Sequence, residues 1–433
     1  MSEPWPNQLL QNVRILDPVS QTDRFGDVWL SEGTIQAVAA QIMDWPEQTQ
    51  IRDGQGLILG PGLIDLYSHS GQPGYESRET LASLGQAAIA GGFTRLTLLP
   101  DTLPVLDQPS GLEWLQAHID PNWPLRWQTW AALTQGLKGE QMTELAELAA
   151  AGALGFSDGQ PLNNLALVRR SLEYLKPLNC PVALWACDRT LAGEGVMREG
   201  IDSLRFGLPG TPAIAETSAL AALLELIAVV QTPVHLMRVS TARSVALLAV
   251  AKAEGLPITA STTWMHLLLD TTAIASYNPH LRVEPPLGQP SDRLALIDGI
   301  KSGVIDAIAI DHTPYTYEEK TVPFAEAPPG AIGLELALPL LWQHLVETQA
   351  LTGLELWQAL STRPSQCLGQ ATAAIAAGQV AELTLFDPQR SGSPSKSLSK
   401  NTPWQGDLTG QVVQTWCGRS SAGFQSASKD PKR

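Results

Sequence analysis

The sequence predicts an α/β protein: a (β/α)₈ barrel with a small β domain built from both ends of the chain. Between about residues 60 and 375, helix-like stretches alternate with short apolar runs that end in polar residues. These runs are apolar throughout, which is typical of parallel strands covered by helices. Strand-like pieces appear before and after this region. An open parallel sheet is the alternative, but the number of repeats over about 320 residues favours a barrel.

The elements can be assigned in chain order. The pieces "NVRILD", "DVWLSEG" and "IQAVA" read as short strands, so residues 1–58 are assigned to the β domain. Residues 59–375 are assigned to the barrel. There "ETLASLGQAAIAGG" precedes "FTRLTLLPDT", with Gly91 and Gly92 at a helix C-terminus, and "DRLALIDGIKSGVI" precedes "DAIAIDHTP". The strands "AELTLFD" and "QVVQTWCG" return residues 376–420 to the β domain. The polar residues 421–433 are predicted to be a disordered tail.

Composition excludes several classes of protein. The 433 residues are 44% hydrophobic and only 16% charged, which indicates a large buried core, and the net charge of −15 disfavours nucleic-acid binding. No apolar run reaches the ~20 residues of a membrane helix, and "MSEPWPNQLL" lacks the basic start of a signal peptide. The four cysteines show no CxxC spacing, which favours reduced thiols. We therefore expect a cytoplasmic protein that binds neither nucleic acid nor membranes.

The chemistry of such a barrel lies at the carboxyl ends of its strands. After the first barrel strand, "DLYSHSGQPG" places His69 two residues after Tyr67. Alternate residues of a strand point to the same side, so a His-x-His at this point commonly holds a metal; here one histidine is missing. The polar residues at the other strand ends are Asp101, Asp158, Cys187, Asp188, Arg238, Thr263, Asp311 and His312.

Several segments together resemble the dihydroorotases, metal-dependent amidohydrolases of the third step of pyrimidine (UMP) synthesis. They are "GPGLIDLYSHSGQPG", "AAIAGGFTRLTLLPDTLPVLD", "LGFSDG", "SKNTPWQG" and a long block from Glu284 to Glu335 that begins "EPPLGQPSDRLALIDG". The resemblance runs in the same order from about residue 8 to about residue 420. It implies an amidohydrolase-type barrel with a flanking composite β domain, and zinc chemistry on a cyclic amide.

The resemblance also implies that most metal ligands have been replaced. The family's ligand positions fall on Tyr67, His69, Asp158, Trp185, Arg238 and Asp311. Tryptophan offers no lone pair and arginine carries a permanent charge, so neither can replace a ligand histidine. His69, Asp158 and Asp311 remain as vestigial ligands, and Asp311 also falls on the family's general base. We therefore expect no metal at this site.

The substrate-binding positions show the same trend. The family's arginine that grips the substrate carboxylate falls on Gly71, and an asparagine falls on Asp101. Another asparagine and arginine fall on Glu284 and Gly288, and a late histidine falls on Tyr315. The expected cavity has thus lost cationic anchors and gained carboxylates.

Without a metal, the carboxylates of Asp158 and Asp311 need another countercharge. Arg238 is the predicted source, through a salt bridge to one or both, and Trp185 is predicted to cover the pair. His235 and His266 are the other imidazoles considered for a new metal site. His235 lies three positions before Arg238, so an extended strand would direct it to the opposite face.

Three functions fit these features. The first is a non-catalytic dihydroorotase homologue retained for assembly, with aspartate transcarbamoylase, as the resemblance implies, or with copies of itself. The second is an active dihydroorotase or related cyclic-amide hydrolase with a single zinc ion on the three remaining ligand positions, His69, Asp158 and Asp311. The third is a protein that binds a different small molecule in the remodelled cavity. The loss of several ligands at once favours the first.

Overall fold

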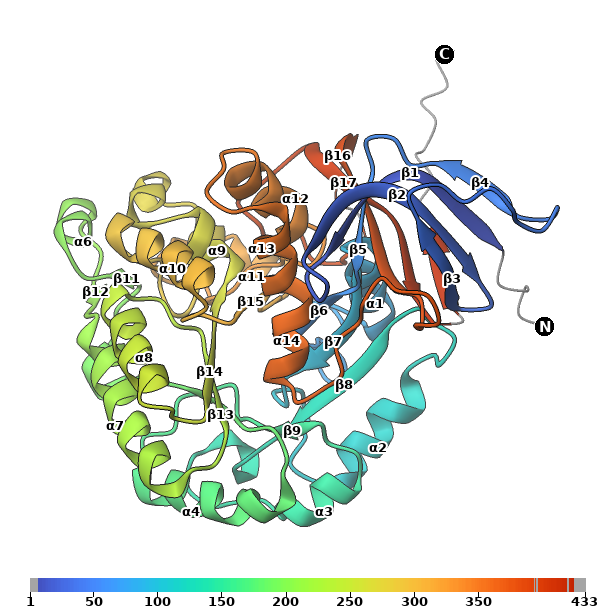
Figure 1. The fold of residues 1–433 in the computed structure, drawn as a ribbon. Helices are drawn as coiled ribbons and strands as arrows, with labels where there is room; N and C mark the ends of the chain where they lie inside the picture. Colours follow the sequence, from blue (N-terminus) through green and yellow to red (C-terminus); the bar gives the residue numbers. More distant parts are fainter. Residues whose placement is uncertain (1–6, 393, 395, 419, 424–433) are drawn as a thin grey trace.

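The computed structural model describes residues 7–392, 394, 396–418 and 420–423, and it has a barrel with a β domain beside it (Figure 1). The barrel has two four-stranded parallel sheets, ordered β6-β7-β8-β9 and β10-β13-β14-β15. The strands are β6 (Leu63–Ser68), β7 (Phe93–Leu98), β8 (Arg126–Ala131), β9 (Gly155–Phe156), β10 (Ala183–Trp185), β13 (Val234–Met237), β14 (Ile258–Thr263) and β15 (Ala307–Ala309).

Backbone contacts close the two sheets into one barrel. A parallel bridge joins Phe156 of β9 to Val182, next to β10. At the other seam the Asp311 N–H donates to the Tyr67 carbonyl at 3.2 Å, and the His69 N–H donates to the His312 carbonyl at 2.8 Å. The first and last strands therefore end side by side, which brings residues far apart in sequence to one rim. The predicted barrel is confirmed.

Helices cover the outside of the barrel between successive strands (Figure 1). The main ones are α1 (Leu81–Ala90), α2 (Pro109–His118), α3 (Leu145–Ala150), α4 (Leu165–Leu175), α7 (Ile214–Val230), α8 (Ala242–Ala253) and α10 (Pro290–Ser302). Shorter helices lie in loops and after β15: α5 (Arg189–Ala192), α6 (Ile201–Phe206), α9 (Trp264–Leu268), α11 (Tyr317–Lys320), α12 (Ala337–Leu341), α13 (Gly353–Trp357) and α14 (Arg363–Cys367).

The ends of α1 show how local sequence sets these helices. Thr80 caps the first turn, and its hydroxyl accepts a hydrogen bond from the Ser83 N–H at 3.1 Å. The helix ends at Gly91, and Gly92 follows with φ +88°, a conformation that glycine adopts without steric cost. The two glycines thus stop the helix where the sequence predicted, directly before β7.

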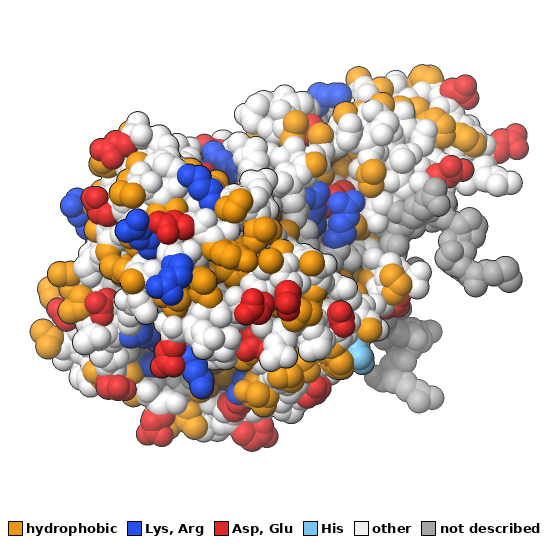
Figure 2. All heavy atoms as spheres, turned by 90° about the horizontal axis from the view of Figure 1, so that it is seen from below, with side chains coloured by type: hydrophobic (Ala, Val, Ile, Leu, Met, Phe, Trp, Pro, Cys, Tyr) orange, Lys and Arg blue, Asp and Glu red, His pale blue; other side chains and the backbone are white. Residues whose placement is uncertain are grey.

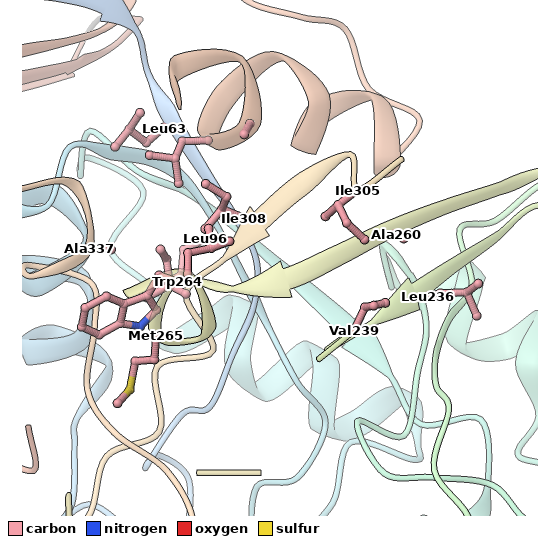
Figure 3. Packing of buried hydrophobic residues seen from close by; sticks show 14 of the residues in the cluster. Leu63, Leu96, Leu236, Val239, Ala260, Trp264, Met265, Ile305, Ile308 and Ala337 are labelled. Atoms are coloured by element: carbon pink, nitrogen blue, oxygen red, sulfur yellow. The ribbon is translucent and has the colours of Figure 1, made fainter. Parts of the chain in front are cut away.

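The main core lies between the strands and the helices. Figure 3 shows Leu63, Leu96 and Ile308 from three barrel strands packed together, with Trp264 and Met265 beside them. A second cluster fills the barrel interior and includes Tyr67, Trp130, Trp185 and Met237. These large side chains occupy the centre of the barrel beneath its carboxyl rim, so the interior is packed rather than open.

The β domain is one sheet made from both ends of the chain, ordered β18-β17-β16-β5-β1-β2-β3, with β4 paired to β1. Its strands are β1 (Gln8–Asp17), β2 (Thr22–Ser31), β3 (Thr34–Ala39), β4 (Gln50–Asp53), β5 (Ile58–Pro61), β16 (Glu382–Gly392), β17 (Leu408–Cys417) and β18 (Ser420–Gly423). The predicted tail began at residue 421, but β18 pairs with β17 through Gly423. The rest of that tail, residues 424–433, lies outside the described residues.

A buried ion pair joins the β domain to the barrel. Arg95 of β7 donates through Nε and Nη2 to the two oxygens of Glu382 in β16, at 2.7 and 2.9 Å. The Thr94 hydroxyl also donates to Glu382, at 2.9 Å. Because both side chains are about 5% exposed or less, this contact fixes the β domain against the strand ends opposite the rim.

The molecular surface has mixed character. On the face shown in Figure 2, the acidic and basic side chains of the described residues are interspersed with apolar ones, and the basic ones form no continuous stripe. Among the described residues, no helix has the length and apolar character needed to cross a membrane.

Candidate functional site

The predicted site residues meet at the carboxyl rim of the barrel, around a cavity of about 160 Å³. His69, Asp101, Trp185, Arg238 and Asp311 all line it, although they come from five different strand ends. An engineered cavity of roughly 150 Å³ can hold a benzene-sized ligand, so a small ring fits here.

Arg238 and Asp311 form a bidentate ion pair in this cavity. Arg238 donates from Nε to Asp311 Oδ2 at 2.8 Å and from Nη2 to Asp311 Oδ1 at 2.6 Å. Its Nη1 donates to the Gly159 carbonyl at 2.9 Å, which places all three guanidinium nitrogens in hydrogen bonds. The side chains are 5% and 12% exposed. The predicted salt bridge between Arg238 and Asp311 is confirmed.

His69 and Asp101 extend this pair into a network of four side chains, which we call the rim network: Asp101, His69, Asp311 and Arg238. His69 Nδ1 lies 2.6 Å from Asp101 Oδ2. Its Nε2 lies 3.2 Å from Arg238 Nη2 and 3.5 Å from Asp311 Oδ1. Carboxylates and cationic groups therefore alternate along the network, and each charge faces at least one of opposite sign.

The pKa values follow from this alternation. Burial alone would lower the pKa of His69, but the carboxylates of Asp101 and Asp311 outweigh burial and raise it to about 9. Burial opposes ionisation of Asp311 as well, yet Arg238 and His69 hold its pKa well below the usual range. At neutral pH the His69 ring is consequently protonated, and the charges of the rim network cancel. Above pH 9, Nε2 can instead accept a hydrogen bond from Arg238.

Two aromatic side chains enclose the guanidinium. The Trp185 ring centroid lies 4.9 Å from Arg238 Cζ and the Tyr67 centroid 5.7 Å from it, both within cation–π range. The Tyr67 hydroxyl lies 2.9 Å from Ser261 Oγ, and it accepts a hydrogen bond from the backbone N–H of Arg238 at 3.1 Å. Trp185 thus covers the pair as predicted, while Tyr67 supports it from below.

The backbone is unusual at both members of the ion pair. Arg238 has φ +55° and Asp311 has φ +53°, in the left-handed region that residues other than glycine rarely adopt. Such conformations cost of order 1–3 kcal/mol each and persist where surrounding contacts enforce them. The two turns aim both side chains across the barrel axis, where they meet.

The turn at Arg238 shows that the predicted direction of the His235 side chain was wrong. Its Nε2 lies 2.8 Å from Ser261 Oγ, the same hydroxyl that contacts Tyr67, so His235 lies inside the barrel and not on the opposite face from Arg238. The prediction assumed that the strand continues through residue 238, whereas β13 ends at Met237. Burial lowers the pKa of His235 to about 3, so it is neutral. His266 is also buried, within 2.7 Å of the Thr263 hydroxyl.

Asp158 does not join the rim network. Its Oδ1 accepts from the N–H groups of Leu133, at 2.7 Å, and Thr134, at 3.0 Å, and its Oδ2 accepts from the Thr134 hydroxyl. The countercharge predicted for Asp158 is therefore not Arg238. Hydrogen bonds from the loop after β8 satisfy this carboxylate, and burial raises its pKa.

Close contacts surround the positions expected to face the substrate. At Gly71 a Cβ atom would lie 2.3 Å from the Glu79 carbonyl oxygen, and at Gly288 it would lie 2.6 Å from Asp292 Cβ. Neither position can accept an arginine without backbone movement. Glu284 lines the cavity but pairs with Arg189 at 2.7 Å, and the Tyr315 ring lies 4.9 Å from Arg78 Cζ.

Sequence reasoning missed two features of the site. It treated Asp101 only as a repulsive charge, whereas Asp101 is the partner of His69. The signal was present, because a new acid and a retained histidine followed adjacent strands. It also missed Arg78, a cavity residue that donates to Glu319 from Nη2 at 2.5 Å. Among the described residues, no three His, Cys, Asp or Glu side chains are placed to hold a metal ion.

Comparisons with known proteins agree with this architecture. Residues 56–244 match the Dihydro-orotase-like family. A "Probable dihydroorotase-like protein" of Synechocystis sp. is 44% identical over 94% of this chain and 98% of its own length. The chain belongs to the dihydroorotase-like family. A dihydroorotase of Pelobacter propionicus, 37% identical over 94% of this chain and 97% of its own, supports the same assignment.

Solved structures of hydantoinases have the same fold as this chain. The L-hydantoinase of Arthrobacter aurescens superposes with a TM-score of 0.84, covering 96% of each chain at 19% identity. The D-hydantoinase of a Thermus species gives 0.77, covering 96% of this chain and 95% of that one at 20% identity. At this identity the likeness establishes the fold, a barrel with a β domain, and nothing about chemistry.

Proposed function

We propose that this chain is a non-catalytic dihydroorotase homologue of pyrimidine (UMP) biosynthesis, in which Arg238 takes the role of the metal. The observation that carries the proposal is the position of one guanidinium nitrogen. Arg238 Nη2 lies 2.6 Å from Asp311 Oδ1 and 3.2 Å from His69 Nε2. These are the side-chain atoms of two vestigial ligand positions, and a permanent cation already stands between them.

The donor set around this point does not suit zinc. Zinc needs three or four N, S or O donors in tetrahedral reach, and Tyr67, Trp185 and Arg238 stand at three ligand positions. Asp158 is the third ligand position that still carries a possible metal-binding side chain. Its carboxylate already accepts hydrogen bonds from the N–H groups of Leu133 and Thr134. A zinc ion would also lie against the Arg238 charge in a buried cavity. This arrangement disfavours the alternative of an active, single-metal cyclic-amide hydrolase.

The proposal is tested by a dihydroorotate hydrolysis assay together with metal analysis of the purified protein. We expect turnover equal to a buffer control with and without added Zn²⁺, and no stoichiometric zinc. The alternative predicts zinc-dependent turnover that Asp311→Ala abolishes. That result would contradict the non-catalytic function and establish the single-metal site.

For such a chain we further propose assembly, with the aspartate transcarbamoylase of the same organism as the partner. The support is the family resemblance together with an intact barrel whose family positions for metal and substrate carry other residues. Mixing the two purified proteins should yield a co-eluting complex in size-exclusion chromatography. Separate elution at micromolar concentrations would contradict this partnership, and a concentration-dependent shift of this chain alone would indicate self-association instead.

A further inference from the structure

A second cavity lies beside the rim cavity, behind Trp185. Its volume is about 50 Å³, and Trp185, Val283 and Glu284 form the wall shared by the two. The remaining sides come from residues between 186 and 198, including Arg198 of β11 (Met197–Arg198), from Thr211 of β12 (Gly210–Thr211), from the start of α7 and from the segment 282–286. We call it the arginine cavity, because Arg189, Arg198 and Arg282 all line it.

Two of these guanidinium groups have unsatisfied donors. Arg198 is 2% exposed; its Nη2 donates to Ser240 Oγ at 2.7 Å and to the Pro286 carbonyl at 3.3 Å, but its buried Nε has no partner. Arg282 Nη1 is also buried without a partner. Among the described residues, neither group forms an ion pair. Buried unsatisfied donors on charged groups are costly, so each requires an explanation.

The acidic residues around the cavity are committed elsewhere. Glu216 Oε1 accepts from the Ser240 N–H at 3.1 Å and from the N–H and hydroxyl of Thr241 at 3.1 and 3.0 Å, and its Oε2 accepts from Ser240 Oγ. Glu284 pairs with Arg189 at 2.7 Å. Among the described residues, Arg198 and Arg282 thus have no ion-pair partner, and Glu284 acts on Arg282 only through its more distant charge. The net charge of the protein is −15.

A third cation lies close to Arg282. Lys320 of α11 is 2% exposed, and its Nζ donates to the carbonyls of Pro279 and Pro328, at 3.2 and 2.7 Å. Burial, reinforced by the charge of Arg282, lowers the pKa of Lys320 to about 7. Burial likewise lowers the pKa of Arg282. The charged forms of Lys320 and Arg282 are thus disfavoured here, and an anion bound beside Arg282 would favour them.

We propose that the arginine cavity binds a compact oxyanion, a carboxylate or a phosphate, between Arg198 and Arg282. One water needs roughly 10–15 Å³ of such space, so a cavity of about 50 Å³ takes a group of four or five heavy atoms. The planar donors of arginine match the oxygens of carboxylate and phosphate, and burial strengthens the contact. The inference stands apart from the proposed function, since it uses no member of the rim network.

Calorimetric titration of the full chain with sodium phosphate, and separately with sodium acetate, tests this inference, with sodium chloride as the reference at equal ionic strength. We expect saturable binding of at least one oxyanion and none of chloride. Tighter binding of phosphate identifies a phosphate site, and tighter binding of acetate identifies a carboxylate site.

Variants decide whether the binding uses this cavity. Arg282→Gln removes a guanidinium whose buried Nη1 has no partner among the described residues, so the fold should persist. The affinity should fall about tenfold or more. Arg198→Lys keeps the positive charge but removes the unpaired Nε donor, so it should weaken anion binding less than Arg282→Gln does. Arg170→Gln, on the exposed surface of α4, is the matched control and should leave the affinity within about twofold.

Two results would overturn the inference. One is wild-type protein that binds neither phosphate nor acetate more tightly than chloride. The other is an Arg282→Gln variant with wild-type affinity, which would place the bound anion elsewhere on the molecule.

Discussion

Two buried arginine–carboxylate pairs, Arg95–Glu382 and Arg238–Asp311, have nearly the same contacts but different surroundings. Both are bidentate, with N···O distances between 2.6 and 2.9 Å. Arg95 lies between the barrel and the β domain. Its third nitrogen, Nη1, donates hydrogen bonds to Gln370 Oε1 at 2.8 Å and to the Ala371 carbonyl at 3.1 Å. Arg238 lies at the wall of a cavity and shares its carboxylate with His69. The same chemical unit can therefore connect two domains or neutralise a carboxylate at the wall of a cavity, and its neighbours decide which.

This difference predicts unequal costs of removal. Truncating one partner of a buried ion pair typically costs about 3–5 kcal/mol, because the other charge is left buried without a partner. Both carboxylates keep a second cation: Arg126 lies 3.4 Å from Glu382 and His69 lies 3.5 Å from Asp311. Arg126 is 48% exposed, so solvent screens its charge, whereas His69 is 15% exposed. Glu382 is also the more buried carboxylate, at 4% against 12% for Asp311, which adjoins a cavity. We expect the interface pair to be the more sensitive of the two.

The largest effect is expected for Arg95→Ala. It should lower the free energy of unfolding by about 4 kcal/mol, measured by chemical denaturation. Exposed Arg170→Ala, on α4, is the control and should change stability by less than about 0.5 kcal/mol. A loss for Arg95→Ala no larger than that of the control would show that the two domains do not depend on this contact.

Arg238→Ala should cost less, about 3 kcal/mol, since His69 still faces Asp311. Replacing both partners, as Arg238→Met with Asp311→Leu, should recover most of that loss, because no charge is then left unpaired. Equal denaturation midpoints for wild type and Arg238→Ala would refute the idea that this arginine neutralises Asp311 in place of a metal.

The third effect depends on pH and comes from His69 of the rim network. The pKa of His69 is about 9 in the folded protein and roughly 6.5 in an unfolded chain, so its protonation stabilises the fold. The contribution is complete below pH 6.5 and disappears as the pH rises through 9. The His69 contribution should fall by about 2 kcal/mol across this window, and by at most about 3.4 by the size of the shift. Lys320, with a pKa of about 7, adds a change of opposite sign, so the His69 contribution is the difference between wild type and His69→Gln.

Two variants check this assignment by unfolding at pH 6.5 and pH 9.5. His69→Gln should remove the pH-dependent loss, whereas Arg95→Lys should retain it, because Arg95 contacts no group that titrates in this range. A pH-dependent loss that persists in His69→Gln would assign the titration to another residue.

The smallest expected effect is that of Tyr67→His on metal binding. Restoring one ligand position leaves Trp185 and Arg238 in place, so the variant should bind zinc no more tightly than wild type in competition with a colorimetric chelator. Turnover of dihydroorotate should stay at the buffer level. Tight zinc binding from this single change would mean that the remaining strand ends are more permissive than their contacts indicate.

The barrel and the Arg238–Asp311 contact were predictable because they depend on patterns that sequence shows directly. Apolar runs, helix-ending glycines such as Gly91 and Gly92, and residue types at strand ends are all local features. The directions of Asp158 and His235 were not predictable, because they depend on where β13 and the loop after β8 turn. The Arg95–Glu382 contact joins residues 287 positions apart, and nothing in either local sequence indicates the other.

The tight fit around Gly71 has a consequence for engineering this loop. The Glu79 carbonyl and the Tyr75 carbonyl would lie 2.3 and 2.7 Å from any Cβ placed there. An arginine introduced at 71 would therefore meet backbone atoms, and the segment from 70 to 79 would have to move before the side chain could enter the cavity. A design that places a cationic anchor at this position must consequently redesign the loop together with residue 71.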